Sequence, residues 1–183
     1  MTRDVPPLPQ TGSDGPPIRL RPEESTDRPF LFALYAATRE TELAATGWSA
    51  AQCAAFLEHQ FAALTSGYAA AYPDADRWIL ERGGTSVGAV IRARTNEEHR
   101  VVYLALAPAH RGRGLGSALL RHLQKQATEA RVPLRLQAFV DSPALRLYRR
   151  LGFVETGTDG LRIRFEYPVP DAPSPRPGAA TPN

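Results

Sequence analysis

The sequence predicts an α/β fold, a mixed and mostly antiparallel central sheet with a βαβ crossover in its middle. Residues 100–107 (Arg-Val-Val-Tyr-Leu-Ala-Leu-Ala) are apolar on both faces, as expected of a central strand. An amphipathic helical pattern over 116–130 separates this strand from another at 134–140, so these two strands are expected to run parallel. Shorter strand-like runs joined by turn residues indicate antiparallel pairing elsewhere.

Apolar spacing and end signals place the elements in the order β, αα, β, β, β, α, β, α, β, β. A first helix is expected over 29–45, and a second begins after the N-cap Ser49 and ends at Gly67. A short helix is expected after the N-cap Ser142, with Pro143 at its first position and Gly152 just past its end. The remaining strands are expected at 18–20, 78–81, 86–94, 153–155 and 161–167.

Proline is concentrated at the two ends of the 183-residue chain. Five of the 17 prolines fall in residues 1–17 and six in residues 168–183, which leaves six for the residues between. Segments of this composition offer too little apolar surface to order themselves. We therefore expect disordered tails at 1–17 and 168–183, and one folded domain over 18–167 that is long enough to bury a core.

Charge and cysteine content exclude several classes of protein. The net charge of +3 is too small for a dedicated nucleic-acid binder, and a single cysteine, Cys53, excludes an internal disulfide and a multi-cysteine metal cluster. No apolar run reaches the roughly 20 residues of a membrane span, and no apolar core of a secretory signal follows Met1. We expect a cytoplasmic protein that binds no nucleic acid, no membrane and no metal.

The segment between the central strand and the amphipathic helix carries the strongest functional signal. It reads Ala-His-Arg-Gly-Arg-Gly-Leu-Gly-Ser over 109–117. Free backbone amides and the positive end of the dipole make a helix N-terminus an anion site, and glycines remove the Cβ atoms that would keep a diphosphate away. Residues 108–135 hold six basic residues and one acidic residue, a local charge of +5, and arginine binds phosphate bidentately.

Other loop motifs fit this segment less well. A Walker loop continues with Gly-Lys-Ser/Thr, and a Gly-x-Gly-x-x-Gly motif counted from Gly112 would need glycine where Ser117 stands. An Arg-Gly-rich RNA-binding tract would be longer and would lie in disordered sequence. A tight turn alone needs one or two glycines and no flanking arginines.

Residues 111–116 resemble the Gln/Arg-x-x-Gly-x-Gly/Ala signature of the GNAT superfamily of N-acetyltransferases, with Leu119 and Leu120 following as in that family. Residues 143–153 are similar to its Ala-x-x-Leu-Tyr-x-x-x-Gly-Phe segment. The resemblance covers about 18–167. Two motifs separated by the expected crossover are more specific than either motif alone.

The resemblance implies that acetyl-CoA is the cosubstrate and lies in the V where the strand around 104–107 splays from the strand 134–140. The diphosphate would sit on the amides of 113–117, and the pantetheine arm would pair with the backbone before the loop. The residues implied in cofactor binding are Leu104, Ala105, Leu106, Arg111, Gly112, Arg113, Gly114, Leu115, Gly116, Ser117 and Asp141, the last where relatives often carry asparagine.

Tyr148 matches the family tyrosine that protonates the departing CoA thiolate, and this is the catalytic role that the resemblance implies for it. The alternative role of Tyr148 is that of a core aromatic. Relatives often carry a carboxylate base near the position of Tyr103, but no Asp or Glu occurs from His99 through Thr128. The base is left open among Glu81, Glu40, Glu42, His99 and a water chain through Tyr103.

The implied function is transfer of an acetyl group from acetyl-CoA to a primary amine of a small-molecule or peptide acceptor, by direct attack on the thioester. The alternative is a non-catalytic CoA-binding or regulatory module of the same fold. Acceptor contacts are expected from 39–42, Trp48 and Tyr68, whose acidic and aromatic character suits an amine. The identity of the acceptor, the acyl-chain preference and a homodimeric state are left open by the sequence.

Overall fold

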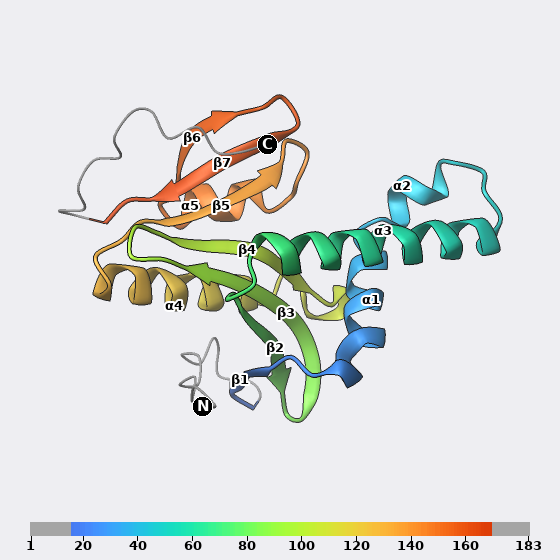
Figure 1. The fold of residues 1–183 in the computed structure, drawn as a ribbon, viewed down its shortest axis with the longest axis horizontal. Coiled ribbons are helices and arrows are strands. Elements are labelled where there is room, and N and C mark those ends of the chain that lie inside the picture. The colour runs from blue at the N-terminus through green and yellow to red at the C-terminus, as the bar shows by residue number, and fades with distance from the viewer. Residues whose placement is uncertain (1–15, 170–183) are drawn as a thin grey trace.

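A computed structural model describes residues 16–169, which form a seven-stranded sheet with helices packed against it (Figure 1). The strands are β1 Ile18–Pro22, β2 Asp76–Arg82, β3 Thr85–Arg94, β4 His99–Leu106, β5 Leu134–Phe139, β6 Val154–Thr158 and β7 Arg162–Tyr167. The helices are α1 Arg28–Ala36, α2 Glu40–Ala44, α3 Ala50–Ala71, α4 Leu115–Glu129 and α5 Leu145–Arg150, with short 3-10 helices η1 Ser25–Asp27 and η2 Pro108–His110.

The sheet has the strand order β1-β2-β3-β4-β5-β7-β6. Neighbouring strands are antiparallel except for β4 and β5, which run parallel and are connected by α4. The predicted fold class and the βαβ crossover are confirmed, and so is the order of elements, except that the first predicted helix is divided into α1 and α2. No helix in the described range is long and apolar enough to cross a membrane.

Most of the two predicted tails lies outside the described residues, which include only 16–17 and 168–169 of them. Val169 is buried, with 6% of its surface exposed. At the other end, the carbonyl of Pro16 accepts a hydrogen bond of 3.4 Å from Nε of Arg82. These two residues therefore contact the folded domain.

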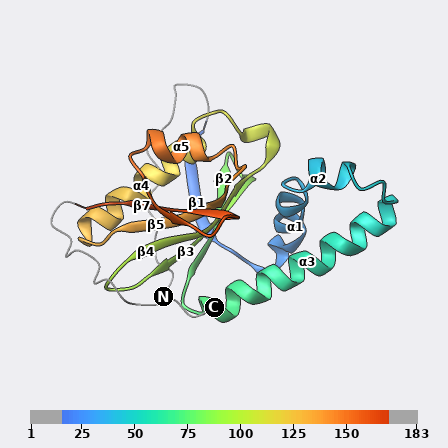
Figure 2. The same ribbon diagram turned by 90° about the horizontal axis from the view of Figure 1, so that it is seen from above.

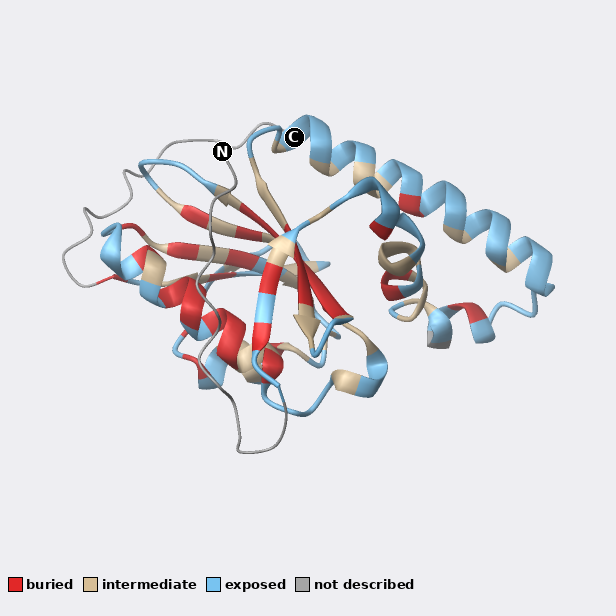
Figure 3. Cartoon of the chain, turned by 90° about the horizontal axis from the view of Figure 1, so that it is seen from below, coloured by how far each residue is buried: buried red, intermediate tan, exposed pale blue. Residues whose placement is uncertain are grey.

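A hydrophobic core lies on each face of the sheet. On one face, Leu119, Leu120 and Leu123 of α4 are fully buried with Phe165 of β7, and Leu145 of α5 joins this cluster. A smaller cluster on the other face joins α1 to the central strands and contains Leu34, Ile79, Ala89 and Ala105. The helices α1 to α3 form a group apart from α4 and α5 (Figure 2), and α3 is exposed along most of its length (Figure 3).

Three helix boundaries differ from the sequence predictions. The helix predicted over 29–45 is broken, because the amide and the hydroxyl of Thr38 both bond to the carbonyl of Tyr35, which ends α1 in a tight turn. Gly67 does not end the next helix, which continues to Ala71. The short helix begins at Leu145, because the hydroxyl of Ser142 caps a preceding turn at the amide of Ala144 (3.3 Å).

A buried polar cluster lies beside the first residues of β4. Arg92, only 3% exposed, stacks on the ring of Trp78 at 4.7 Å and pairs with Asp76 at 3.1 Å. His99 is buried nearby, and its Nδ1 has no hydrogen-bond partner among the described residues. Burial, together with the nearby charges of Arg92 and Arg94, lowers the pKa of His99 from 6.5 to about 4.

We expect the protein to lose stability as the pH falls from 6.5 to about 4. In this interval the unfolded chain binds a proton at His99 that the folded chain does not bind, so each step to lower pH favours unfolding. His99→Gln should therefore flatten this part of the stability curve, measured by urea unfolding at several pH values. The control His59→Gln, at an exposed position of α3, should leave the curve unchanged, and equal slopes in all three proteins would contradict the prediction.

Candidate functional site

The central feature of the site is the separation of β4 from β5. Their parallel register pairs residues 99–101 with 134–136 and ends there, although β4 continues to Leu106 and β5 to Phe139. At the same point β4 has a β-bulge. Val101 pairs with Arg92 and Tyr103 with Ile91, so Val102 has no partner on β3. A bulge bends its strand. The end of β4 therefore turns away from β5, and the two strands form the V that the family resemblance implies.

A helix begins beside this V with glycine at its N-cap. Gly112 and Gly114 have φ angles of +71° and +80°, in the left-handed region that glycine adopts without strain. The first intrahelical bond of α4 joins the amide of Ala118 to the carbonyl of Gly114 (3.0 Å), so the amides of 115–117 have no partner within the helix. No acidic residue lies in this first turn. The geometry is that of an anion site.

The loop, the end of β4 and α5 meet at one place. A Cβ atom on Gly116 would lie 3.7 Å from the Leu106 side chain and 3.5 Å from that of Leu147 on α5. Nε of Arg111 donates a hydrogen bond of 2.9 Å to the carbonyl of Leu106. Arg111 was predicted to bind phosphate, and in the structure it also holds the loop against the end of β4.

The β4 residues predicted to bind the cosubstrate have side chains directed to the two cores. Leu104 and Leu106 pack toward α4, and Ala105 packs toward α1. Leu115 of the loop is also buried, with 1% exposure. These residues can therefore offer backbone groups to a ligand. Arg113, just before α4, is exposed, and Ser117 in its first turn is half-buried.

Tyr148 lies on α5 with its ring packed against Phe153 and Phe165, at centroid separations of 5.9 and 5.5 Å. Burial raises the pKa of its phenol. The hydroxyl therefore keeps its proton near neutral pH and can act as a proton donor. The preceding residue, Leu147, faces Gly116 at the start of α4. The packing of Tyr148 is that of a core aromatic, and its role as proton donor stays a prediction.

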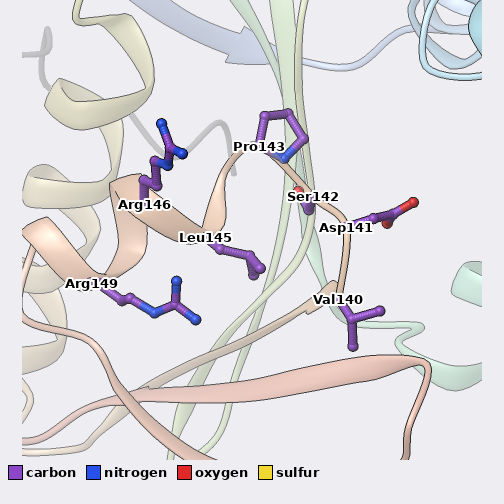
Figure 4. A pocket seen from close by; sticks show the side chains of 7 residues that line it. All are labelled: Val140, Asp141, Ser142, Pro143, Leu145, Arg146 and Arg149. Carbon is purple, nitrogen blue, oxygen red and sulfur yellow. The ribbon is translucent and has the colours of Figure 1, made fainter.

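A cavity of about 350 Å³ opens where β5 leads into α5 (Figure 4). Its lining consists of Val140, Asp141, Ser142, Pro143, Leu145, Arg146 and Arg149. In Figure 4 the carboxylate of Asp141 points away from the two arginines. Arg149 pairs with Glu155 at 2.6 Å, with both side chains about half exposed. Sequence reasoning did not single out Arg146 and Arg149, whose only local signal is the arginine-rich stretch around Tyr148.

The expected acceptor contacts are divided between two places. Trp48 is 45% exposed, stacks edge-on against Phe56 and precedes α3, whose first turn lies far from β4 and β5 (Figure 1). There, it lines a second cavity of about 420 Å³ together with Glu40. Tyr68 lies instead over Tyr103 of β4, with ring centroids 6.1 Å apart. Of these residues, Tyr68 lies beside the V, and so does Arg39, whose guanidinium lies 5.8 Å from the ring of Phe139 at the end of β5.

The structure narrows the choice of general base. Glu81 pairs with Arg21 at 2.7 Å on β2, and His99 is buried where β4 and β5 are still joined. Neither lies at the open end of the V. Burial raises the pKa of Tyr103 well above its ordinary value, so this phenol stays protonated and can only relay a proton. Glu42 is exposed and accepts a hydrogen bond from Nη1 of Arg39 (2.9 Å).

Residues 73–155 match the family of acetyltransferase (GNAT) domains. Over 73 residues the chain is 37% identical to streptothricin acetyltransferase of Streptomyces lavendulae, a match that spans 39% of each chain. The PaiA N-acetyltransferase of Thermoplasma acidophilum, solved with coenzyme A, has a TM-score of 0.62 at 17% identity, covering 82% of this chain and 98% of that one.

A GNAT family acetyltransferase of Elizabethkingia anophelis with acetyl-CoA bound has a TM-score of 0.57 at 16% identity, with 83% of this chain and 98% of that chain covered. At these identities the two structures establish a shared fold. The chain spans about two fifths of the length of the curated relative that it matches.

Proposed function

We propose that this chain, whose residues 73–155 match the GNAT acetyltransferase domain, transfers an acetyl group from acetyl-CoA to a primary amine of a small-molecule acceptor. The observation that carries the proposal is the start of α4, where free amides adjoin the V between β4 and β5. The streptothricin acetyltransferase relative and the fold neighbours with coenzyme A or acetyl-CoA support it.

The residues present fit acetyl-CoA. The amides of 115–117, next to the φ-positive Gly114, would hold the diphosphate, and exposed Arg113 would add positive charge. The backbone of 104–106, beyond the paired part of β4, would bind the pantetheine arm as an added strand. Asp141 borders the neighbouring cavity. When bound, acetyl-CoA supplies an acetyl group activated as a thioester.

The chain's own contribution to the chemistry is to hold and move protons. Tyr148 keeps a proton on its hydroxyl because burial raises its pKa, and this proton is available to the leaving sulfur. On the acceptor side, Tyr103 stays protonated beside Tyr68 and can relay a proton from the amine to water. No carboxylate on β4 is needed in this scheme, provided that the amine reaches the site uncharged.

Acetyl-CoA should raise the melting temperature, and Gly114→Val should abolish this shift. At a ligand concentration 100 times Kd, binding adds about 2.7 kcal/mol, roughly 5–10 °C for a domain of this size. The valine side chain would cover the amides at the start of α4. Gly160→Val is the matched control, because Gly160 also has a positive φ (+86°) with open space around it, in the turn between β6 and β7. An unchanged shift in Gly114→Val would exclude this cofactor site.

Tyr148→Phe should lower kcat at least about tenfold while leaving acetyl-CoA binding almost unchanged. Phenylalanine keeps the ring packed on Phe153 and Phe165 and removes only the hydroxyl, and general acid catalysis typically contributes about 10²–10⁴-fold. Tyr167→Phe, in the same aromatic cluster at 5.8 Å from Phe153, should turn over at the parent rate. If Tyr148→Phe also keeps the parent rate, Tyr148 serves packing alone.

Release of free CoA thiol in the presence of a library of primary amines tests the activity itself. We expect time-dependent release with at least one amine and none without an acceptor. A protein that binds acetyl-CoA but releases no CoA with any amine would be a binding module, and the proposed transfer would be wrong.

A further inference from the structure

We propose that the acceptor carries an anionic oxygen group, a carboxylate or a phosphate, beside its amine, and that Arg39 and Arg162 bind this group. The inference rests on the proposed acetyl transfer and names the class of its acceptor. Its basis is a cluster of arginine and aromatic side chains at the open end of the V, which sequence reasoning did not bring together.

The cluster is centred on Phe139, the last residue of β5. The guanidinium carbon of Arg162, at the start of β7, lies 4.9 Å from the Phe139 ring centroid, and that of Arg39, between α1 and α2, lies 5.8 Å from it. Arg39 also lies 5.6 Å from the ring of buried Tyr35. Two cations from distant parts of the sequence therefore share one aromatic ring.

Strand alternation places this cluster on the face of the sheet opposite α4 and α5. Ala138 and Ile163 pack into the core under α4, so their neighbours Phe139 and Arg162 point to the other face. Tyr103 packs on that same face toward α1, with Tyr68 of α3 over it. Burial raises the pKa of Tyr68, and Arg162 and Arg39 both oppose this rise, as expected of cations close to its hydroxyl.

The positive charge of the cluster is only partly compensated by the protein. The carboxylate of Asp159 feels the charge of Arg162, which helps to lower its pKa, but it accepts its hydrogen bonds from backbone amides, including that of Arg162 (2.6 Å). Arg39 pairs with Glu42, whose side chain is 64% exposed, so water screens this pair. Stacking on an aromatic ring leaves the N–H edge of a guanidinium free, which suits bidentate binding of a carboxylate or phosphate.

The same pair of arginines favours the reactive form of the amine. Cations near an ammonium group disfavour its charged form and so lower its pKa. The ammonium group first loses one proton to water, and the neutral nitrogen attacks the carbonyl carbon and forms the N–C bond. The C–S bond breaks and the sulfur takes a proton from the Tyr148 hydroxyl. The nitrogen gives up its second proton to water, from which Tyr148 is reprotonated. Binding of the acceptor's anion by Arg39 and Arg162 would thus place its amine beside Tyr103 with a lowered pKa. Such an amine loses its proton more easily, which suits a site where β4 has no carboxylate base.

Matched acceptors test the proposal through CoA release. We expect kcat/KM to be at least about tenfold higher for amino acids than for their carboxamides, or for O-phosphoethanolamine than for ethanolamine, and the preferred pair identifies the anion. Arg162→Gln and Arg39→Gln should each raise KM for the anionic acceptor about 10–100-fold and leave KM for the matched uncharged acceptor unchanged. Arg164→Gln, two residues along β7, is the matched control and should behave like the parent. Equal kcat/KM for the neutral and anionic acceptors, or an equal change of KM for both in Arg162→Gln, would overturn the proposal.

A binding measurement separates this proposal from the proposed function. In the presence of CoA, N-acetyl amino acids or N-acetyl phosphoethanolamine should raise the melting temperature of the parent, and Arg162→Gln should lose this shift while keeping the shift caused by CoA alone. If no amine supports CoA release, the acetyl transfer is wrong, whereas the thermal shift still decides whether the two arginines bind an anion. Absence of any anion-dependent shift in the parent would overturn the anion site.

Discussion

The site depends on the point at which β4 leaves β5. In a continuous sheet both neighbours of a central strand take up its backbone hydrogen-bonding groups. Here the parallel pairing stops after three residues, at the bulge that leaves Val102 without a counterpart on β3. The last residues of β4 then bond to β3 on one side only, in the middle of the sheet. A ligand can take the place of the missing strand there without any change in the hydrophobic cores.

The crossover connection places an anion site beside this opening. A parallel pair of strands needs a long connection, and here η2 and the glycine loop lead from the C-terminal end of β4 into the helix α4. Its positive end therefore lies at the same edge as the open end of the V. The buried leucines of α4 fix the helix on the sheet, and the bond from Arg111 to the carbonyl of Leu106 fixes the loop to the strand. Rigid packing thus holds the free amides in place.

The two faces of the sheet serve different parts of the proposed reaction. The face covered by α4 and α5 carries the glycine loop and Tyr148, which suit the cosubstrate and its leaving group. The opposite face carries Tyr68, Tyr103 and the arginines around Phe139, which suit the acceptor. Because β4 and β5 separate, the proposed reaction would use the two groups of side chains from opposite sides of the same opening. This arrangement is consistent with an active site whose β4 has no carboxylate.

The sequence by itself determined the element order, the crossover and the glycine loop, because each depends on patterns between residues close along the chain. Local signals were less reliable at helix ends: side-chain bonds of Thr38 and Ser142 to nearby backbone shifted two boundaries, and Gly67 is tolerated within α3. Only the tertiary structure decided which distant side chains meet at the V. Arg39, Phe139 and Arg162 share no periodic pattern, and they come together because β5 and β7 pair in one register while the end of α1 packs against the same face. The order of the strands and their register depend on which faces of the sheet become buried in the folded protein. The pattern of residues along the chain does not specify this.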